Sequence, residues 1–184
     1  MTPLDGRDPL ALQSRFIAEA GALSCQMHSV QDGSEAAQIV LQLLGGDKRV
    51  AAWDFSEIPC LPLSGSLHEA DVAVVPFNDP DVRAGITGAA AALAATGSLV
   101  MVSGPGRYRS TPLLPKLHIA IITTDQIVPN MESWLAQQRE YDLQSFQASN
   151  INIISGPSRT ADIAMELILG MHGPGALHII IVQD

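Results

Sequence analysis

Two segments of this 184-residue chain share one pattern of residue types that could bind an anion. Each reads Ser-Gly-Pro-x-Arg: Ser103–Arg107 follows one apolar run, and Ser155–Arg159 follows another. Glycine lets the backbone approach a ligand, free amides at the start of a helix attract negative charge, and arginine can hold a carboxylate or phosphate through two parallel hydrogen bonds. Ligands of parallel α/β proteins bind beyond the carboxyl ends of the strands, so both loops are predicted to form one site on the same edge of a sheet.

The residues predicted to bind the anion lie in and directly after these two loops. They are Ser103, Gly104, Gly106, Arg107, Arg109, Ser155, Gly156, Ser158, Arg159 and Thr160. The alternative is that each Gly-Pro pair only shapes a tight turn and that the arginines are solvated. A third Gly-Pro segment, His172–Gly175, precedes a strand instead of following one, and is predicted to be structural and to lie on the opposite edge.

No complete catalytic or metal-binding motif accompanies this pattern. Gly156–Thr160 lacks the second glycine of a nucleophile elbow, and the chain has neither a dinucleotide fingerprint nor a phosphate-binding P-loop. Cys25 and His28 would point to opposite faces of a strand, which argues against a metal pair. His118 and His178 lie in apolar runs and are interpreted as core histidines. The sequence therefore names no catalytic residue and no metal ligand, and leaves open whether the chain is an enzyme.

The elements that must position the loops form an alternating series. Near-continuous Val, Ile and Leu runs predict strands buried on both faces, as in a parallel sheet. They are Val72–Val75, Leu99–Val102, Leu117–Ile122, Ile151–Ile154 and Leu177–Val182, with weaker candidates at Cys25–Val30 and Arg49–Trp53. Helices are predicted at Pro9–Ala22 capped by Asp8, Ser34–Leu44 capped by Ser34, Thr87–Ala94, Pro129–Arg139 and Arg159–Leu169, and a loop at Asp142–Asn150. This alternation predicts a three-layer α/β/α sandwich with a mainly parallel sheet.

Composition and charge exclude several classes of protein. The formal net charge of −9, from ten basic and nineteen acidic residues, argues against a nucleic-acid partner. All nineteen acidic residues lie outside Ala84–Thr124, which holds Arg107, Arg109 and Lys116. Ala84–Gly106 has no charged residue but is interrupted by glycines, so a buried helix and strand are expected there in place of a membrane span. Because no signal peptide is recognisable, a cytoplasmic location with free thiols is expected.

Several ordered segments then resemble the LUD family, also called YkgG or DUF162. These segments are Gly85–Ala89, Ala94–Val100, Ser103–Gly106, Leu113–Ala120, Ile127–Pro129, Ser155–Ile163, Leu169–Pro174 and Leu177–His178. The resemblance is specific over residues 85–182 and loose over residues 1–84, which are interpreted as the first part of the same single domain, 1–184. It adds Thr87, Gly88, Thr96 and Gly97 to the candidate anion-binding residues.

The resemblance also implies a fold and a function. The expected fold is the Rossmann-like sandwich of NagB, RpiA and the CoA transferases. The expected role is in the oxidation of L-lactate to pyruvate, as one subunit beside partner subunits that carry the iron–sulfur clusters. This chain would bind no cofactor, since its two cysteines cannot supply the four thiolates that a cluster normally takes. Its own ligand would be a small carboxylate or phosphate, and a homo-oligomer is compatible with the sequence.

Three departures from the family pattern keep other functions open. Ala90, Ala95 and Ala164 occupy positions where the family usually has acidic residues. A methyl group can act neither as a general base nor as a nucleophile, so any chemistry that depends on those acids is missing here. The alternatives are a stand-alone sugar-phosphate or CoA-ester enzyme, and a catalytically silent scaffold or regulator.

Overall fold

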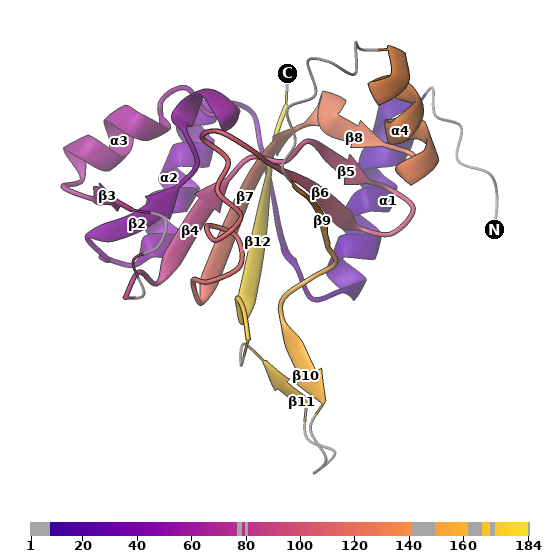
Figure 1. Ribbon diagram of the computed structural model, residues 1–184. Coiled ribbons are helices and arrows are strands. Elements are labelled where there is room, and N and C mark those ends of the chain that lie inside the picture. The colour runs from indigo at the N-terminus through magenta and orange to yellow at the C-terminus, as the bar shows by residue number, and fades with distance from the viewer. Residues whose placement is uncertain are drawn as a thin grey trace.

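A six-stranded, fully parallel sheet forms the centre of the computed structural model, which describes residues 8–76, 79, 81–140, 150–161, 167–169 and 172–183. The strand order is β1-β12-β7-β4-β2-β3 (Figure 1). The strands are β1 (Gln26–Val30), β2 (Arg49–Ala52), β3 (Ala73–Val75), β4 (Ala84–Thr87), β7 (Leu117–Thr123) and β12 (Ala176–Val182). All the predicted strands that belong to this sheet are confirmed, and β4 is an addition to them.

A second sheet of four strands has the order β8-β5-β6-β9. Its strands are β5 (Ala91–Leu93), β6 (Ser98–Ser103), β8 (Ile127–Val128) and β9 (Asn150–Ile154). In this sheet β6 runs antiparallel to both β5 and β9. A separate antiparallel pair, β10 (Arg159–Ala161) and β11 (Leu167–Leu169), projects from the body at the end of the molecule where β7 and β12 begin (Figure 1).

Two helices cover one face of the parallel sheet, and the second sheet covers the opposite face. The helices are α1 (Pro9–Ala22), α2 (Gly33–Leu44), α3 (Leu63–Glu69) and α4 (Met131–Glu140), with short 3₁₀ turns η1 (Phe55–Glu57) and η2 (Thr124–Gln126). From β1 through β2 to β3 the chain moves across the sheet in one direction, and from β4 through β7 to β12 it moves back. Right-handed crossovers therefore put α2 and α3 on one face and the second sheet on the other. The predicted α/β sandwich is confirmed, with a sheet in its third layer.

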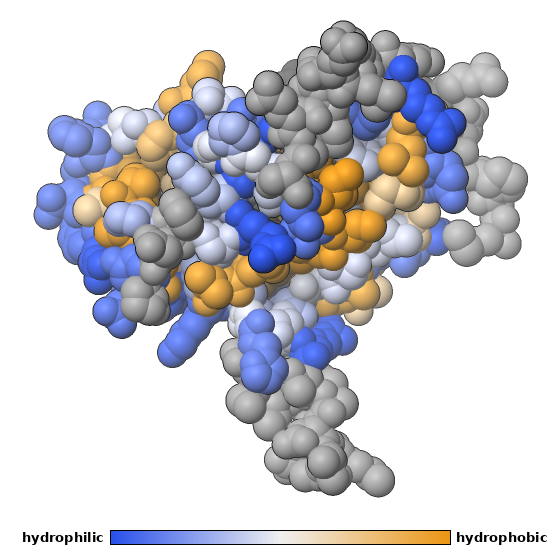
Figure 2. Space-filling view, viewed as in Figure 1, coloured by the Kyte–Doolittle hydropathy of each residue, from blue (hydrophilic) through white to orange (hydrophobic). Residues whose placement is uncertain are grey.

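The core follows from strands that are apolar along their whole length. Every residue from Leu117 to Ile122 of β7 is buried, which only a strand covered on both faces allows. A second apolar cluster lies between the second sheet and α4, where Trp134 is 2% exposed. On the face seen in Figure 2, apolar surface also continues over β6 and β9. This apolar surface agrees with the exposed side chains of Ile151 and Ile153, which both lie in β9.

Three sequence predictions about this region are wrong. The helix predicted at Thr87–Ala94 is the end of β4 followed by β5, because its alanines fit between two closely packed layers. The strands predicted at Leu99–Val102 and Ile151–Ile154 exist, but they pair antiparallel in the second sheet. The helix predicted at Arg159–Leu169 is replaced by the β10–β11 pair.

Two further expectations concern a loop and a membrane span. The loop predicted at Asp142–Asn150 lies outside the described residues except for Asn150, which begins β9. The uncharged stretch Ala84–Gly106 forms β4, β5, β6 and their connections. Across the described residues, no helix has both the length and the apolar character that crossing a membrane requires.

Of the two helix caps predicted from the sequence, one is confirmed and the other is wrong. Asp8 caps α1 as predicted and accepts hydrogen bonds from the amides of Leu10 and Ala11. Helix α2 begins one residue earlier than predicted, and its cap is Asp32, not Ser34. The Asp32 carboxylate accepts from the Ser34 amide at 2.8 Å and the Glu35 amide at 3.0 Å.

The capping assignment predicts a difference between two neighbouring substitutions. Asp32→Ala should lower the free energy of unfolding by about 1 kcal/mol, because two amides of the first turn lose their acceptor. Ser34→Ala, at an exposed position in the first turn, should change it by less than about 0.5 kcal/mol. Urea unfolding of both variants measures the difference. An equal loss of unfolding free energy in the two variants would contradict the assignment of Asp32, and not Ser34, as the cap.

Candidate functional site

The two Ser-Gly-Pro loops lie at opposite ends of the β6–β9 strand pair. Ser103 at the end of β6 pairs with Asn150 at the start of β9, whereas Ile154 at the end of β9 pairs with Leu99. Four residues of strand separate the two levels, which is about 14 Å at the usual rise per residue. The prediction that both loops share one edge is wrong, because it assumed that both strands belong to a parallel sheet.

The second loop, Ser155–Arg159, is tied to the turn between α1 and β1. The Arg159 guanidinium donates from Nη2 to the Leu23 carbonyl at 2.8 Å and to the Ser24 hydroxyl at 2.5 Å. Gly156 has φ +88°, and a Cβ there would lie 2.6 Å from the Leu23 carbonyl oxygen. Arg159 is thus engaged in holding the fold.

The other candidates at this end of the pair have contacts of their own. The hydroxyl groups of Ser155 and Ser98 are 2.8 Å apart. Ser158 donates its amide to the Pro174 carbonyl at 2.8 Å and lines a cavity treated below. Thr160 lies in β10, and its side chain is outside the described residues.

The two Thr-Gly pairs also lie apart from each other. Thr87 is fully buried, and its hydroxyl is 2.8 Å from Nε2 of His118. A Cβ on Gly88 would lie 2.3 Å from the Glu57 carbonyl oxygen, so the absence of a side chain at Gly88 makes room for the η1 turn. Thr96 and Gly97 form the β5–β6 turn, where Gly97 packs against α1. The structure thus places these four residues where they pack against neighbouring elements or form a turn.

The first loop, with Arg109 beyond it, forms a small polar cavity. It has a volume of about 270 Å³ and is lined by Ser103, Gly104, Arg107, Tyr108, Arg109 and Asn150. The structure therefore brings together four of the predicted residues and adds Tyr108 and Asn150, which sequence reasoning missed. The pairing of Ser103 with Asn150 across β6 and β9 explains why a residue about fifty positions away lines the same cavity.

Backbone contacts to the end of β2 hold this loop in place. The Asp54 amide donates to the Gly106 carbonyl at 2.8 Å, and the Trp53 indole donates to the Tyr108 carbonyl at 3.1 Å. Gly106 has φ +72°, and a Cβ there would lie 2.9 Å from Cβ of Asp54. Hydrogen bonds from the amide and hydroxyl of Ser56 lower the pKa of the Asp54 carboxyl, which stays ionised at neutral pH.

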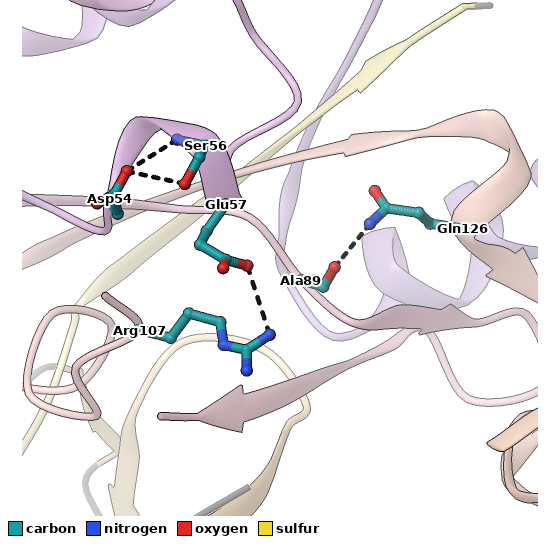
Figure 3. Close-up of polar contacts among 6 residues, drawn as sticks. All are labelled: Asp54, Ser56, Glu57, Ala89, Arg107 and Gln126. Atoms are coloured by element: carbon teal, nitrogen blue, oxygen red, sulfur yellow. Dashed lines mark hydrogen bonds and ion pairs between the residues drawn. The ribbon is translucent and has the colours of Figure 1, made fainter. Parts of the chain in front are cut away.

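Glu57 forms an ion pair with one of the two arginines. Figure 3 shows the Arg107 guanidinium pointing toward Glu57 of the η1 turn, with Nη1 3.4 Å from Oε2. The Arg107 side chain is 27% exposed and keeps donors for a further partner. Arg109 is exposed and forms no ion pair with any described carboxylate. Asp54, which packs against Gly106, is a second carboxylate beside this loop, so the two guanidinium groups are matched in number by two carboxylates, and the site would hold a small anion through the geometry of its donors.

The loops beyond the neighbouring strands are linked by further contacts. The side chain of Gln126 in η2 donates to the Ala89 carbonyl at 2.7 Å (Figure 3). It also accepts from the Thr123 amide at 2.9 Å. Ala90, one of the three alanines at positions where the family resemblance leads us to expect an acid, donates its amide to the Val100 carbonyl at 2.8 Å. The loop after β4 is therefore fixed by its backbone.

The thiols do not form a nucleophilic or metal-binding centre in the described structure. Cys25 and Cys60 are both free and buried. Burial raises the pKa of the Cys25 thiol to about 11 and also raises the pKa of Cys60, so both are protonated at neutral pH. No group of three metal-ligating side chains occurs among the residues that the structure describes.

The fold and this cavity define a Rossmann-like α/β protein with a small arginine-lined cavity at the end of its second sheet. Comparison with family models makes the assignment specific: the model of the LUD domain matches residues 80–182, more than half of the chain. The chain therefore belongs to the LUD domain family, as its sequence motifs predict.

Curated relatives and a solved structure agree with this assignment. The chain is 44% identical over 101 residues to lactate utilization protein C of Exiguobacterium sp., a match that covers 54% of this chain and 44% of that relative. It is 34% identical over 147 residues to lactate utilization protein C of Shouchella clausii, covering 76% of this chain and 64% of the relative. The uncharacterized protein YkgG of Escherichia coli is 30% identical over 181 residues, covering 92% and 78%.

The structural comparison supports the fold along nearly the whole chain. The crystal structure of a DUF162 family protein from Deinococcus radiodurans superposes with a TM-score of 0.67 at 23% identity. It covers 95% of this chain and 98% of that one. The chain spans 44% of the length of the Exiguobacterium relative, so it shares only part of that protein.

Proposed function

We propose that this chain is a lactate-utilization protein of the LUD family that binds a small carboxylate at Arg107 and Arg109. The observation that carries the proposal is the cavity of about 270 Å³ in which both arginines meet Ser103 and Asn150. Its support from relatives is the name lactate utilization protein C, borne by several curated proteins that match this chain.

The chemistry of the lining suits a 2-hydroxy or 2-oxo acid. A guanidinium offers two parallel donors to one carboxylate, and these charge-assisted hydrogen bonds offset the desolvation of that group. The Asn150 side chain has both a donor and an acceptor within the same cavity, so it can bond the neighbouring hydroxyl or carbonyl oxygen. The ligand class is therefore L-lactate or pyruvate.

The redox step would belong to partner subunits that carry iron–sulfur clusters. Support comes from the count of two cysteines in this chain, against the four thiolates that a cluster normally takes. In this division of labour the chain binds and positions the carboxylate and docks to its partners. Recovery of iron–sulfur proteins with the tagged chain from lactate-grown cells would support the assembly, and recovery of none would contradict it.

Removal of either arginine should weaken carboxylate binding. Arg107→Ala and Arg109→Ala should each raise the Kd for L-lactate and for pyruvate about 10- to 100-fold, the usual worth of a hydrogen bond to a charged group. Isothermal titration of the purified chain measures this effect. Inorganic phosphate, titrated in parallel, should bind more weakly than lactate; tighter binding of phosphate would favour the sugar-phosphate or CoA-ester alternative.

Arg159→Ala is the matched control. It removes the same charge from the other Ser-Gly-Pro loop, where the guanidinium bonds Leu23 and Ser24, so it should leave both Kd values unchanged. An equal loss of affinity in this variant would mean that net charge, and not the cavity, accounts for binding. In cells that lack the gene, growth on lactate should return with the wild-type chain and not with Arg107→Ala; normal growth of the deletion strain would refute the lactate role.

A further inference from the structure

A second cavity, of about 260 Å³, lies at the other end of the molecule, where β7 and β12 begin. Its walls come from the Ser155–Ser158 loop, the His172–Pro174 loop and the first residues of these two strands. The Ser158 amide donates to the Pro174 carbonyl at 2.8 Å, which joins the second and the third Gly-Pro segments. The prediction that the third segment lies opposite the second is therefore wrong: the two meet around one cavity.

The cavity has apolar walls and no charge among its described lining. Leu113, Ile153 and Leu177 contribute apolar side chains, and no Asp, Glu, Lys or Arg lines it. An ion placed there would lose hydration without gaining a counter-ion, which is strongly unfavourable. The cavity therefore selects against carboxylates and phosphates, in contrast to the site at Arg107.

His118, which lines the cavity, has one buried polar atom with no hydrogen-bond partner among the described residues. His118 is 1% exposed, and its Nε2 is 2.8 Å from the Thr87 hydroxyl. Its Nδ1 is buried and has no partner among the described residues. Burial lowers the pKa of this imidazole to about 3, so at neutral pH Nδ1 is either one N–H donor or one lone-pair acceptor. An unpaired buried polar atom is destabilising, and a ligand that bonds it would remove that penalty.

We propose that this cavity binds a small uncharged molecule with an apolar body and one amide, carbonyl or hydroxyl group that pairs with Nδ1 of His118. The apolar body replaces water against the leucine and isoleucine walls, and the polar group meets the unpaired Nδ1. The volume far exceeds the share of one water molecule, about 30 Å³. This site is separate from the carboxylate site and does not depend on the function proposed for it.

Benzamide and benzoate test the proposal, because they have nearly the same shape and differ in charge. Benzamide has both a donor and an acceptor, so it can pair with either tautomer of His118. Titration of the full chain, followed by the imidazole ¹⁵N signals, should give a saturable shift of His118 Nδ1 with benzamide and binding at least about tenfold weaker with benzoate. Equal binding of the two, or binding of benzamide without a shift of His118, would overturn the proposal.

Substitution of His118 gives a second test. His118→Phe keeps a ring of similar size and removes Nδ1, so benzamide affinity should fall at least about tenfold. Arg107→Ala, which alters the other cavity, should leave benzamide affinity unchanged. An unaltered affinity in His118→Phe would overturn the proposal, and if that variant fails to fold, the ¹⁵N titration of the wild-type chain decides alone.

Discussion

Gly97→Ala should lower the free energy of unfolding by about 3–5 kcal/mol, a large share of the stability of an ordinary domain. Two costs add at this position. Gly97 has φ +65°, which strains any residue with a Cβ. A Cβ there would also lie 2.2 Å from the Ala20 nitrogen and 2.5 Å from the Glu19 carbonyl carbon, both in the backbone of α1. Because a helix backbone cannot move like a flexible side chain, the β5–β6 turn and α1 must separate.

Gly45→Ala supplies the matched control for this prediction. Gly45 caps the end of α2 with φ +60°, but no atom lies within 4 Å of the added Cβ. It should therefore cost only the backbone strain, about 1–2 kcal/mol. Urea unfolding of both variants measures the difference, which reports the contact between Gly97 and α1. Equal losses in the two variants would show that this contact has no energetic weight.

Gly97 also shows what a sequence motif leaves undecided. A glycine beside a threonine in a conserved-looking turn suits the close approach of a ligand and equally suits the close approach of a helix. Gly88 and Gly156 pose the same problem, since backbone atoms of Glu57 and Leu23 lie where their Cβ atoms would be. The spacing of small residues predicts that something approaches the backbone there, and only the fold decides what it is.

The parallel sheet could be predicted because its strands need both faces covered. Leu117–Ile122 and Leu177–Val182 have no polar face, apart from one histidine each, and helices and a second sheet bury them. The first helix was equally well marked, by Asp8 at its cap and Pro9 at its first turn. In these elements local preference and tertiary packing favour the same structure.

The errors arise where local preference and packing disagree. Ala89–Ala92 is a run of strong helix formers, yet the layer between the parallel sheet and α4 requires thin, extended backbone with small side chains. Arg159–Leu169 has a plausible cap and a helical spacing of apolar residues, but its ends pair as β10 and β11. Tertiary context overrides propensity in both segments.

The candidate site could be predicted only in part, because its position depends on the direction in which each strand runs. A motif after a strand predicts a loop at the strand's end, but it does not give the direction of that strand. Because β6 and β9 are antiparallel, similar loops after them lie at opposite ends of the pair, and the loop at Arg107 lines a cavity together with Arg109. The local excess of basic residues in Ala84–Thr124 lies at this end, although Glu57 from outside the stretch offsets part of it, and anion binding there stays a prediction.

Acidification from about pH 7.5 to about pH 5 should lower the free energy of unfolding by about 2 kcal/mol through His118 alone. In the folded chain burial lowers the pKa of His118 to about 3, whereas in the unfolded chain it returns to the usual value near 6.5. The unfolded state therefore binds the proton first. The stability that neutral His118 contributes is complete above pH 6.5 and is lost as the pH falls toward 3.

The stacked pair His28 and His178 should add to this loss in the same direction. Their ring nitrogens are 3.0 Å apart, and burial lowers the pKa of both imidazoles, with the charge of His28 lowering that of His178 further. His118→Phe separates the contributions: it should remove about 2 kcal/mol of the pH dependence and leave the part that comes from the stacked pair. Urea unfolding at several pH values between 7.5 and 5 measures both slopes. An unchanged slope in His118→Phe would mean that this imidazole is already solvated in the folded state, which would also remove the unpaired atom on which the second cavity's selectivity depends.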